Sequence, residues 1–345
     1  MKKVLIICMI LFLFTLPGCT HKPDAVESNA NKNVNSVPDF EYSENEDGGI
    51  TVTDYIGTDT DISIPAEIDG KPVTQIGAGA FAYNEDIKSI EMPDTVTIIK
   101  SEAFHGCTSL SAVSLSQNLE SIEDGAFLRC TKLSDISLPP SLNSIGYSVF
   151  ANCIKLSKIA LPDALNSLGL QAFEDCTSLK YIKIPPSITT IEFATFKNSG
   201  LEILELEAGL EKIGREAFKN TKIKTVMLPR TITELGDSAF YNCTGLESIT
   251  LNEGLIVISD GALGGQSKLT EIIIPKSVTK MTEGAFWNCS TLKAVKFEGN
   301  APEDYRSDLV YAGETEQDFS YTICYHPEAS GFTSPEWCGY PTEIW

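Results

Sequence analysis

Histidine and basic side chains are scarce in this chain. Its 345 residues include 3 histidines and 26 Lys+Arg against 47 Asp+Glu, which gives a formal net charge of −21. Nucleic acids are bound mainly by basic side chains that displace counterions, so this balance argues against a nucleic acid partner.

Motifs of catalytic and cofactor chemistry are also missing. No Gly-rich phosphate loop, His-Glu-x-x-His or Gly-x-Ser-x-Gly sequence occurs, and His21, His105 and His326 have no suitably spaced partner. We therefore expect no cofactor, no metal and no catalytic residues, and we predict that the protein is not an enzyme.

Long apolar runs are absent except at the N-terminus. Lys2 and Lys3 precede an apolar run from Val4 to Phe14. This run is shorter than the roughly 20 residues that a membrane-spanning helix needs. A charged start followed by an apolar stretch and small residues is typical of export signals. We predict a signal peptide over residues 1–18.

The end of that signal points to a lipid anchor. The segment Leu16-Pro17-Gly18-Cys19 resembles a bacterial lipobox, although Pro17 is unusual at its position. The resemblance implies that Cys19 becomes the lipidated N-terminus, held in the cell envelope at the outer face of a membrane. An ordinary secretory signal is the alternative. Residues 19–48 are polar and Asn-rich, which predicts a flexible tether.

A repeat of 22 or 23 residues fills most of the remaining chain. One position in each repeat, which we call the mark, holds Phe81, Phe104, Phe127, Phe150, Phe173, Phe196, Phe218, Phe240, Leu263 and Phe286. Each mark is followed by a Leu-x-x-Ile-x-Leu run or a close variant, as in residues 133–138. The period of two in this run predicts a short strand.

Each repeat is too short to bury its own apolar face, so neighbouring repeats must stack. We predict an α/β repeat solenoid of coils of about 23 residues, with short parallel strands joined by helical or irregular turns. The predicted boundaries are an N-terminal cap over 49–75, the solenoid over 76–299 and a C-terminal cap over 300–345.

The pattern Leu-x-x-Ile-x-Leu-Pro-x-x-Leu-x-x-Ile-Gly-x-x-Ala-Phe-x-x-Cys resembles the BspA-like leucine-rich repeats of bacterial surface proteins, over Ile50 to Gly299. The resemblance implies a non-catalytic adhesion or binding module for a protein, peptide or glycan. The alternative is an envelope-associated glycan- or cell-wall-active enzyme that uses the repeats for targeting. Only residues 300–345 remain to build such a catalytic part.

Cysteines recur three residues after the mark. They are Cys107, Cys130, Cys153, Cys176, Cys243 and Cys289. A small polar group at this position can hydrogen-bond the turn backbone, so we predict a structural ladder. Disulfides between coils and a metal site are the alternatives, although the Cys-x-x-Cys pairs of zinc sites are missing.

The last 45 residues are rich in aromatic side chains and resemble the terminal segment of the same family, as in Gly331 to Pro341. We predict that they cover the open end of the solenoid, with a carbohydrate-binding platform as the alternative. Cys324 and Cys338 lie in this exported segment, where a disulfide between them is plausible.

Side chains alternate along a strand, so the two residues beside the central apolar residue of each run point away from the core. In the middle repeats these residues form the candidate ligand-binding face: Tyr181, Lys183, Ile203, Glu205, Thr225 and Met227. An ordinary strand surface with scattered apolar residues is the alternative.

Overall fold

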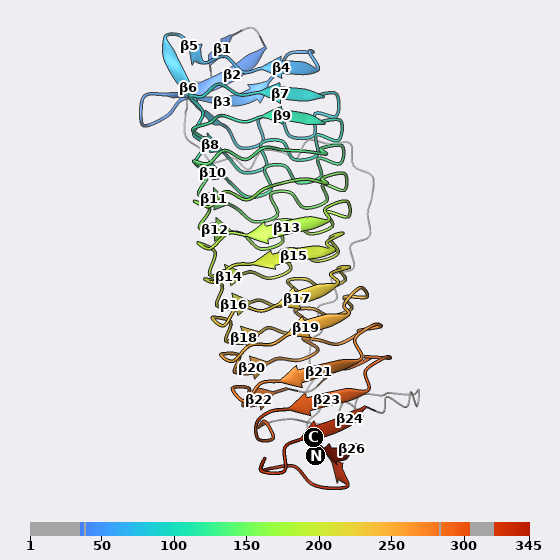
Figure 1. Cartoon of the computed structure of the whole chain (residues 1–345). Helices are drawn as coiled ribbons and strands as arrows, with labels where there is room; N and C mark the ends of the chain where they lie inside the picture. Colours follow the sequence, from blue (N-terminus) through green and yellow to red (C-terminus); the bar gives the residue numbers. More distant parts are fainter. Residues whose placement is uncertain (1–34, 38, 283, 304–320) are drawn as a thin grey trace, which may run out of the picture. The chain divides into compact units, whose positions relative to one another are not determined.

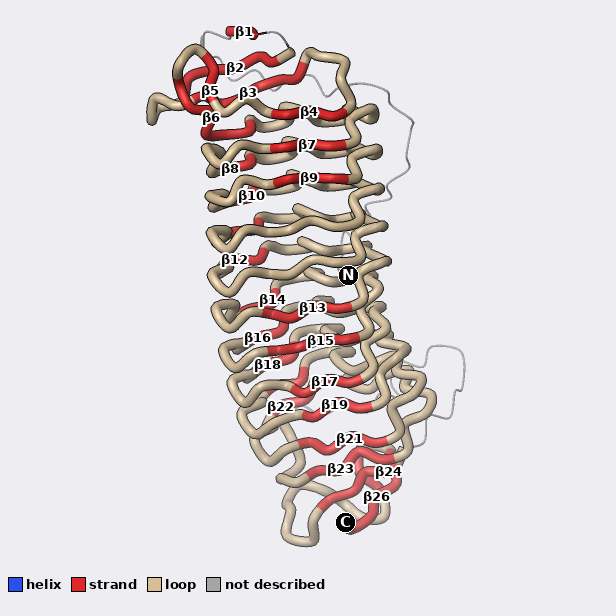
Figure 2. The backbone as a smooth tube through the Cα atoms, turned by 45° about the horizontal axis from the view of Figure 1, so that its top comes forward, coloured by secondary structure: helices blue, strands red, loops and turns tan. Residues whose placement is uncertain are grey.

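The structure, a computed structural model, describes residues 35–37, 39–282, 284–303 and 321–345. All regular structure in these residues is β-strand, with no helix (Figure 2). The predicted solenoid of parallel strands is therefore confirmed, whereas the α/β class and the helical turns are wrong. Nothing in the described part of the chain forms an apolar helix of membrane-spanning length.

The Leu-x-x-Ile-x-Leu runs form a first ladder of parallel strands (Figure 1). Its strands are β4 (Asp61–Ser63), β7 (Ser89–Glu91), β9 (Ala112–Ser114), β13 (Tyr181–Ile184), β15 (Ile203–Leu206), β17 (Thr225–Met227), β19 (Ser248–Thr250), β21 (Glu271–Ile274) and β23 (Ala294–Phe297). These strands form separate parallel sheets, namely β4-β7-β9, β13-β15, β17-β19 and one that begins β21-β23. Between β9 and β13, the runs of two coils are joined by a single parallel bridge, from Asp135 to Lys158.

A second ladder contains the apolar residue that lies five positions before each mark. Its strands are β3 (Ile50–Tyr55), β6 (Lys71–Ile76), β8 (Ile98–Ile99), β10 (Ser121–Ile122), β11 (Ser144–Ile145), β12 (Ser167–Leu168), β14 (Thr190–Ile191), β16 (Lys212–Ile213), β18 (Glu234–Leu235), β20 (Val257–Ile258) and β22 (Lys280–Met281). Successive strands pair in parallel, but β12 and β14 belong to separate sheets.

The N-terminal cap begins earlier than predicted. Strands β1 (Asn35–Val37) and β2 (Phe40–Glu44) form an antiparallel sheet with β3, and β5 (Glu67–Ile68) pairs with β6. Residues 40–44 were predicted to belong to the tether, but they form β2, in which Phe40 and Tyr42 are buried in the core.

The C-terminal cap continues the first ladder. Strand β24 (Thr322–Tyr325) lies parallel to β23, and β26 (Tyr340–Ile344) lies parallel to β24. Strand β25 (Glu336–Trp337) closes an antiparallel hairpin with β26. The rings of Tyr321 and Tyr340 stack at 4.3 Å between centroids and are buried, so this segment supplies apolar cover for the last coil.

The marks form the centre of the core. Rings of successive coils stack from Phe81 to Phe240, with centroids 4.9–5.6 Å apart. At the N-terminal end the stack is extended by Tyr55, whose ring centroid lies 5.7 Å from that of Phe81. Leu263 interrupts the aromatic series but is equally buried. The repeat frame read from the sequence therefore identifies the buried positions.

The backbone around each mark explains why no helix forms there. In every coil, the residues two before and two after the mark have φ between +50° and +76°. An α-helix needs φ near −63°, so these two residues exclude one. The amide groups instead have two kinds of partner: Phe104 N–H donates to Ala126 O of the next coil, whereas Cys107 N–H donates to Phe104 O of its own coil. We call the segment from two residues before the mark to three residues after it the corner. The bonds between coils join neighbouring corners as they would join strands.

Candidate functional site

Six residues predicted for the binding face lie together on three consecutive coils. Tyr181 of β13 pairs in register with Ile203 of β15, and Lys183 pairs with Glu205. Strand β17, which carries Thr225 and Met227, lies against β15. All six side chains point to solvent because the residues between them, such as Ile182, fill the core.

Three of these side chains are large and apolar. Tyr181 is 43% exposed, Ile203 55% and Met227 72%. We call these three residues the strand patch. Large exposed apolar patches are uncommon on monomeric proteins and often mark interaction surfaces.

Paired charges border the strand patch. Glu202 bridges Lys180 and Lys224 of the adjacent coils, with N···O distances of 3.3 and 3.0 Å. The hydrogen bonds from Lys224 and Lys180 hold the pKa of Glu202 below its ordinary value. At the carboxyl ends of the strands, Lys183 Nζ lies 2.9 Å from a carboxylate oxygen of Glu207. These pairs neutralise charge locally, although the molecule as a whole is strongly acidic.

Tyr181 is held in place by the next coil. Its hydroxyl donates to Glu205 Oε2 at 3.1 Å. Desolvation and this hydrogen bond raise the pKa of Tyr181 above its ordinary value, so its hydroxyl stays a donor at neutral pH. The ring is thereby oriented before any ligand arrives, which lowers the entropy lost on binding.

Ile273 continues the outward apolar residues of the first ladder beyond the six candidate residues. Ile273 of β21 is 43% exposed and occupies the strand position of Met227, two coils further along. Its outward place in the run Ile272-Ile273-Ile274 is the signal that identifies it.

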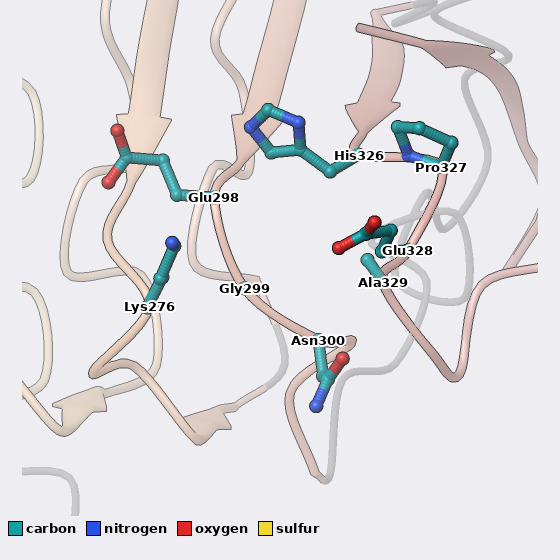
Figure 3. A pocket seen from close by; sticks show the side chains of 8 residues that line it. All are labelled: Lys276, Glu298, Gly299, Asn300, His326, Pro327, Glu328 and Ala329. Carbon is teal, nitrogen blue, oxygen red and sulfur yellow. The ribbon is translucent and has the colours of Figure 1, made fainter.

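A polar hollow of about 560 Å³ lies at the carboxyl ends of β21, β23 and β24 (Figure 3). Lys276 and Glu298 stand on one side of it, and His326 and Glu328 on the other. Asn300 is fixed at its edge because its side-chain oxygen accepts the Ser330 N–H at 2.9 Å. No spacing pattern in the sequence predicts this group, because three separate loops bring it together.

The cysteine ladder is confirmed as structural. Each Sγ donates to the carbonyl oxygen of the mark in the preceding coil at 3.1–3.3 Å. Where Gln266 replaces cysteine, its Nε2 makes the same bond to Phe240 O at 2.7 Å. Burial raises the pKa of Cys107, Cys153 and Cys243 to about 12. Cysteine binds a metal as the thiolate, so thiols whose pKa is raised by burial are poor metal ligands.

The remaining sequence candidates have the following positions. Cys324 lies in β24 and Cys338 in the turn between β25 and β26, and burial raises the pKa of both. A disulfide between them stays a prediction. The predicted signal peptide 1–18 and Cys19 lie outside the described residues. No group of three metal-ligating side chains occurs within the described ranges.

The two described histidines pack against aromatic rings. The ring of His105 lies 4.8 Å from that of Tyr83, and burial lowers the pKa of this histidine. His326 contacts Trp345 at 5.1 Å between ring centroids. The position of His105 in a corner therefore reflects packing.

Comparison with known proteins identifies the repeat. A family model described as "BspA type Leucine rich repeat region" matches residues 74–202 and 189–303, with 6 copies. A solved leucine rich repeat protein of T. pallidum is 28% identical, with a TM-score of 0.51 over 61% of this chain and 90% of that one.

Two further solved structures share the fold. A leucine-rich repeat protein from Bacteroides ovatus is 23% identical, with a TM-score of 0.57 over 90% of this chain and 99% of that one. The pneumococcal vaccine antigen PcpA is 20% identical, with a TM-score of 0.54 over 86% of this chain and 94% of that one. No curated protein matches the chain.

Proposed function

Because the chain belongs to the BspA type leucine-rich repeat family, we propose that it is a non-catalytic binding module that recognises a protein ligand through the strand patch. The observation that carries this proposal is the exposure of Tyr181, Ile203 and Met227 on consecutive coils, at 43%, 55% and 72%. Apolar anchors surrounded by polar residues are the usual composition of the centre of a protein–protein interface.

The backbone supports this use of the patch. Every coil adds two outward side chains at a fixed strand position, and core residues on either side of them are buried. The anchors therefore stand on strands β13, β15 and β17, whose inward residues are packed in the core, so little main-chain entropy is lost on binding. The paired charges at the border add specificity more than affinity, since exposed ion pairs are worth about 1 kcal/mol or less.

We expect the triple change Tyr181→Ser, Ile203→Ser, Met227→Ser to abolish capture of the protein ligand. Serine removes the apolar area that binding would bury, while the exposed positions leave the core intact. The measurement is a pull-down of the tagged chain against candidate partners, followed by titration of each captured protein by calorimetry. The melting temperature of the variant should stay close to that of the wild type.

A matched control uses apolar residues of similar exposure outside the first ladder. Tyr147, Ile154 and Ile256 are 45%, 40% and 46% exposed. Changing these three to serine should leave the affinity unchanged. If the folded strand-patch variant binds with wild-type affinity, the patch is not the site, and the C-terminal cap with its polar hollow is the next surface to test.

The proposal includes export and attachment to a membrane by a lipid on Cys19. We expect Cys19→Ala to release the protein from the membrane fraction or to block its processing, because no thiol remains to be acylated. Fractionation with metabolic labelling by a fatty acid measures this. Cys8→Ala, within the predicted signal peptide, is the control and should leave retention unchanged. Normal cleavage and retention of the Cys19 variant would contradict the anchor.

A further inference from the structure

One boundary between neighbouring coils differs from those beside it. On its N-terminal side, Asn166 and Ser167 N–H donate to Asn143 O, and Gly169 N–H donates to Ile145 O at 2.9 Å. These bonds join β12 to the coil before it. The equivalent bonds across the next boundary would run from Thr189, Thr190 and Glu192 to the coil of β12.

Those equivalent bonds are not formed among the described residues. The Thr189, Thr190 and Glu192 amides do not donate to the carbonyl groups of Asn166 and Leu168. In contrast, β14 is joined to the following coil, where Gly214 N–H donates to Ile191 O at 2.7 Å. A cleft of about 470 Å³ lies between the two strands. Its lining is Asn166, Ser167, Leu168, Gly169, Leu170, Ile188, Thr189, Thr190 and Glu192.

The first ladder, which is also interrupted between β15 and β17 and between β19 and β21, is open at the same boundary. Glu202 and Ile203 N–H donate to Lys180 O at 3.0 and 3.1 Å, but within the described chain no such bond joins Lys180 or Tyr181 to Ser157. This boundary therefore lacks the usual hydrogen bonds on both strand faces.

The corner of the same two coils is closed. Gln171 N–H donates to Phe193 O at 3.0 Å, and Asp175 N–H donates to Lys197 O at 2.9 Å. The rings of Phe173 and Phe196 stack at 5.4 Å with an interplanar angle of 1°. The two coils are thus joined along the corner, although their strand faces are not hydrogen-bonded to each other.

We propose that the cleft between β12 and β14 binds an extended peptide segment through main-chain hydrogen bonds. A parallel strand directs alternate residues to its two neighbours. In this cleft it would accept from the amides of Thr190 and Glu192 and donate to the carbonyl groups of Asn166 and Leu168. Strand addition of this kind takes its affinity from main-chain bonds. The cleft lies on the second ladder and is independent of the strand patch.

The chemistry of the walls favours a peptide over other ligands. Apart from Glu192, the polar side chains that line the cleft are uncharged: Asn166, Ser167, Thr189 and Thr190. The remaining donors and acceptors are main-chain groups at strand spacing, which match another main chain and offer no charge pair for an ionic ligand.

The probe is a capped peptide that copies residues 142–147 (Leu-Asn-Ser-Ile-Gly-Tyr), which already pairs in this ladder with β12. Hydrogen exchange of the full chain is measured by mass spectrometry with and without it. Without peptide, the amides of 189–192 should exchange faster than those of 166–169. The peptide should slow exchange at 189–192, and a copy methylated on its backbone nitrogens should not.

Two variants separate main-chain from side-chain recognition. Thr190→Val keeps the amide and should bind the fluorescent peptide with unchanged affinity. Thr190→Pro removes the N–H and should weaken binding by about tenfold or more, equivalent to about 1.4 kcal/mol. Unchanged exchange at 189–192 at saturating peptide, or equal binding of the methylated copy, would overturn the proposal and leave a cleft filled by water alone. Should Thr190→Pro fail to fold, the methylated copy on the wild type decides the question.

Discussion

Replacing Phe150 with alanine is expected to lower the free energy of unfolding by about 3 to 5 kcal/mol, as large aromatic deletions in cores do. The ring of Phe150 is fully buried and stacks between those of Phe127 and Phe173, at 5.6 and 5.4 Å. Alanine would leave a cavity that stacked coils cannot close, because hydrogen bonds in the corner fix their spacing. Chemical denaturation followed by circular dichroism measures the loss.

Phe150→Leu is the matched control for this variant. Leucine occupies the mark naturally at Leu263, where it is fully buried. It retains most of the apolar volume, so its destabilisation should be clearly smaller than that of alanine. A denaturation midpoint of Phe150→Ala equal to that of the wild type would show that the mark is not the centre of the core.

Gly200→Ala is expected to destabilise the protein by about 1 to 3 kcal/mol or more, because one added methyl group meets main-chain atoms. A Cβ at this position would lie 2.1 Å from Thr177 O. Gly200 N–H also donates to Cys176 O at 3.1 Å, so the two coils cannot separate there without losing a bond. Gly200 lies between Phe196 and Phe218, in the first of the two repeats that have 22 residues instead of 23.

Thr177→Ala places alanine at the equivalent position of the preceding, full-length coil. Thr177 is exposed and its hydroxyl makes a long hydrogen bond to Ile154 O, at 3.4 Å, so this control should change stability by no more than about 0.5 kcal/mol. Thermal and chemical unfolding of both variants test the comparison. Equal stability of the two would contradict the steric explanation for glycine in the shortened repeat.

The features that could be predicted from the sequence are those that depend on the same type of residue recurring at the same position of each repeat. The marks, the cysteine ladder and the outward residues of the strands all follow from apolar and small residues at a fixed period. The helical turns were predicted wrongly because non-glycine residues such as Glu102, Ser148 and Ala194 hold positive φ values. One signal for positive φ was present in the sequence. Asparagine recurs two residues after the mark, and asparagine tolerates this conformation better than most residues.

The parts of the site that the sequence did not predict depend on main-chain spacing. The segments around Ser167 and Thr190 have the same pattern as their neighbours, yet the strands are separated there. The polar hollow likewise joins Lys276, Glu298 and His326 from loops that share no repeat position. Periodicity specifies which face a residue occupies, but not how far apart two coils lie.

The buried thiols allow six of the coils to be probed chemically. Reaction with an alkylating reagent requires the thiolate, which is very scarce at neutral pH for Cys107, Cys153 or Cys243 while the pKa is about 12. Local opening removes the burial and restores ordinary thiol reactivity. The labelling rate at each cysteine therefore reports how often that coil opens. Comparison of these rates along the chain shows which part of the solenoid opens first.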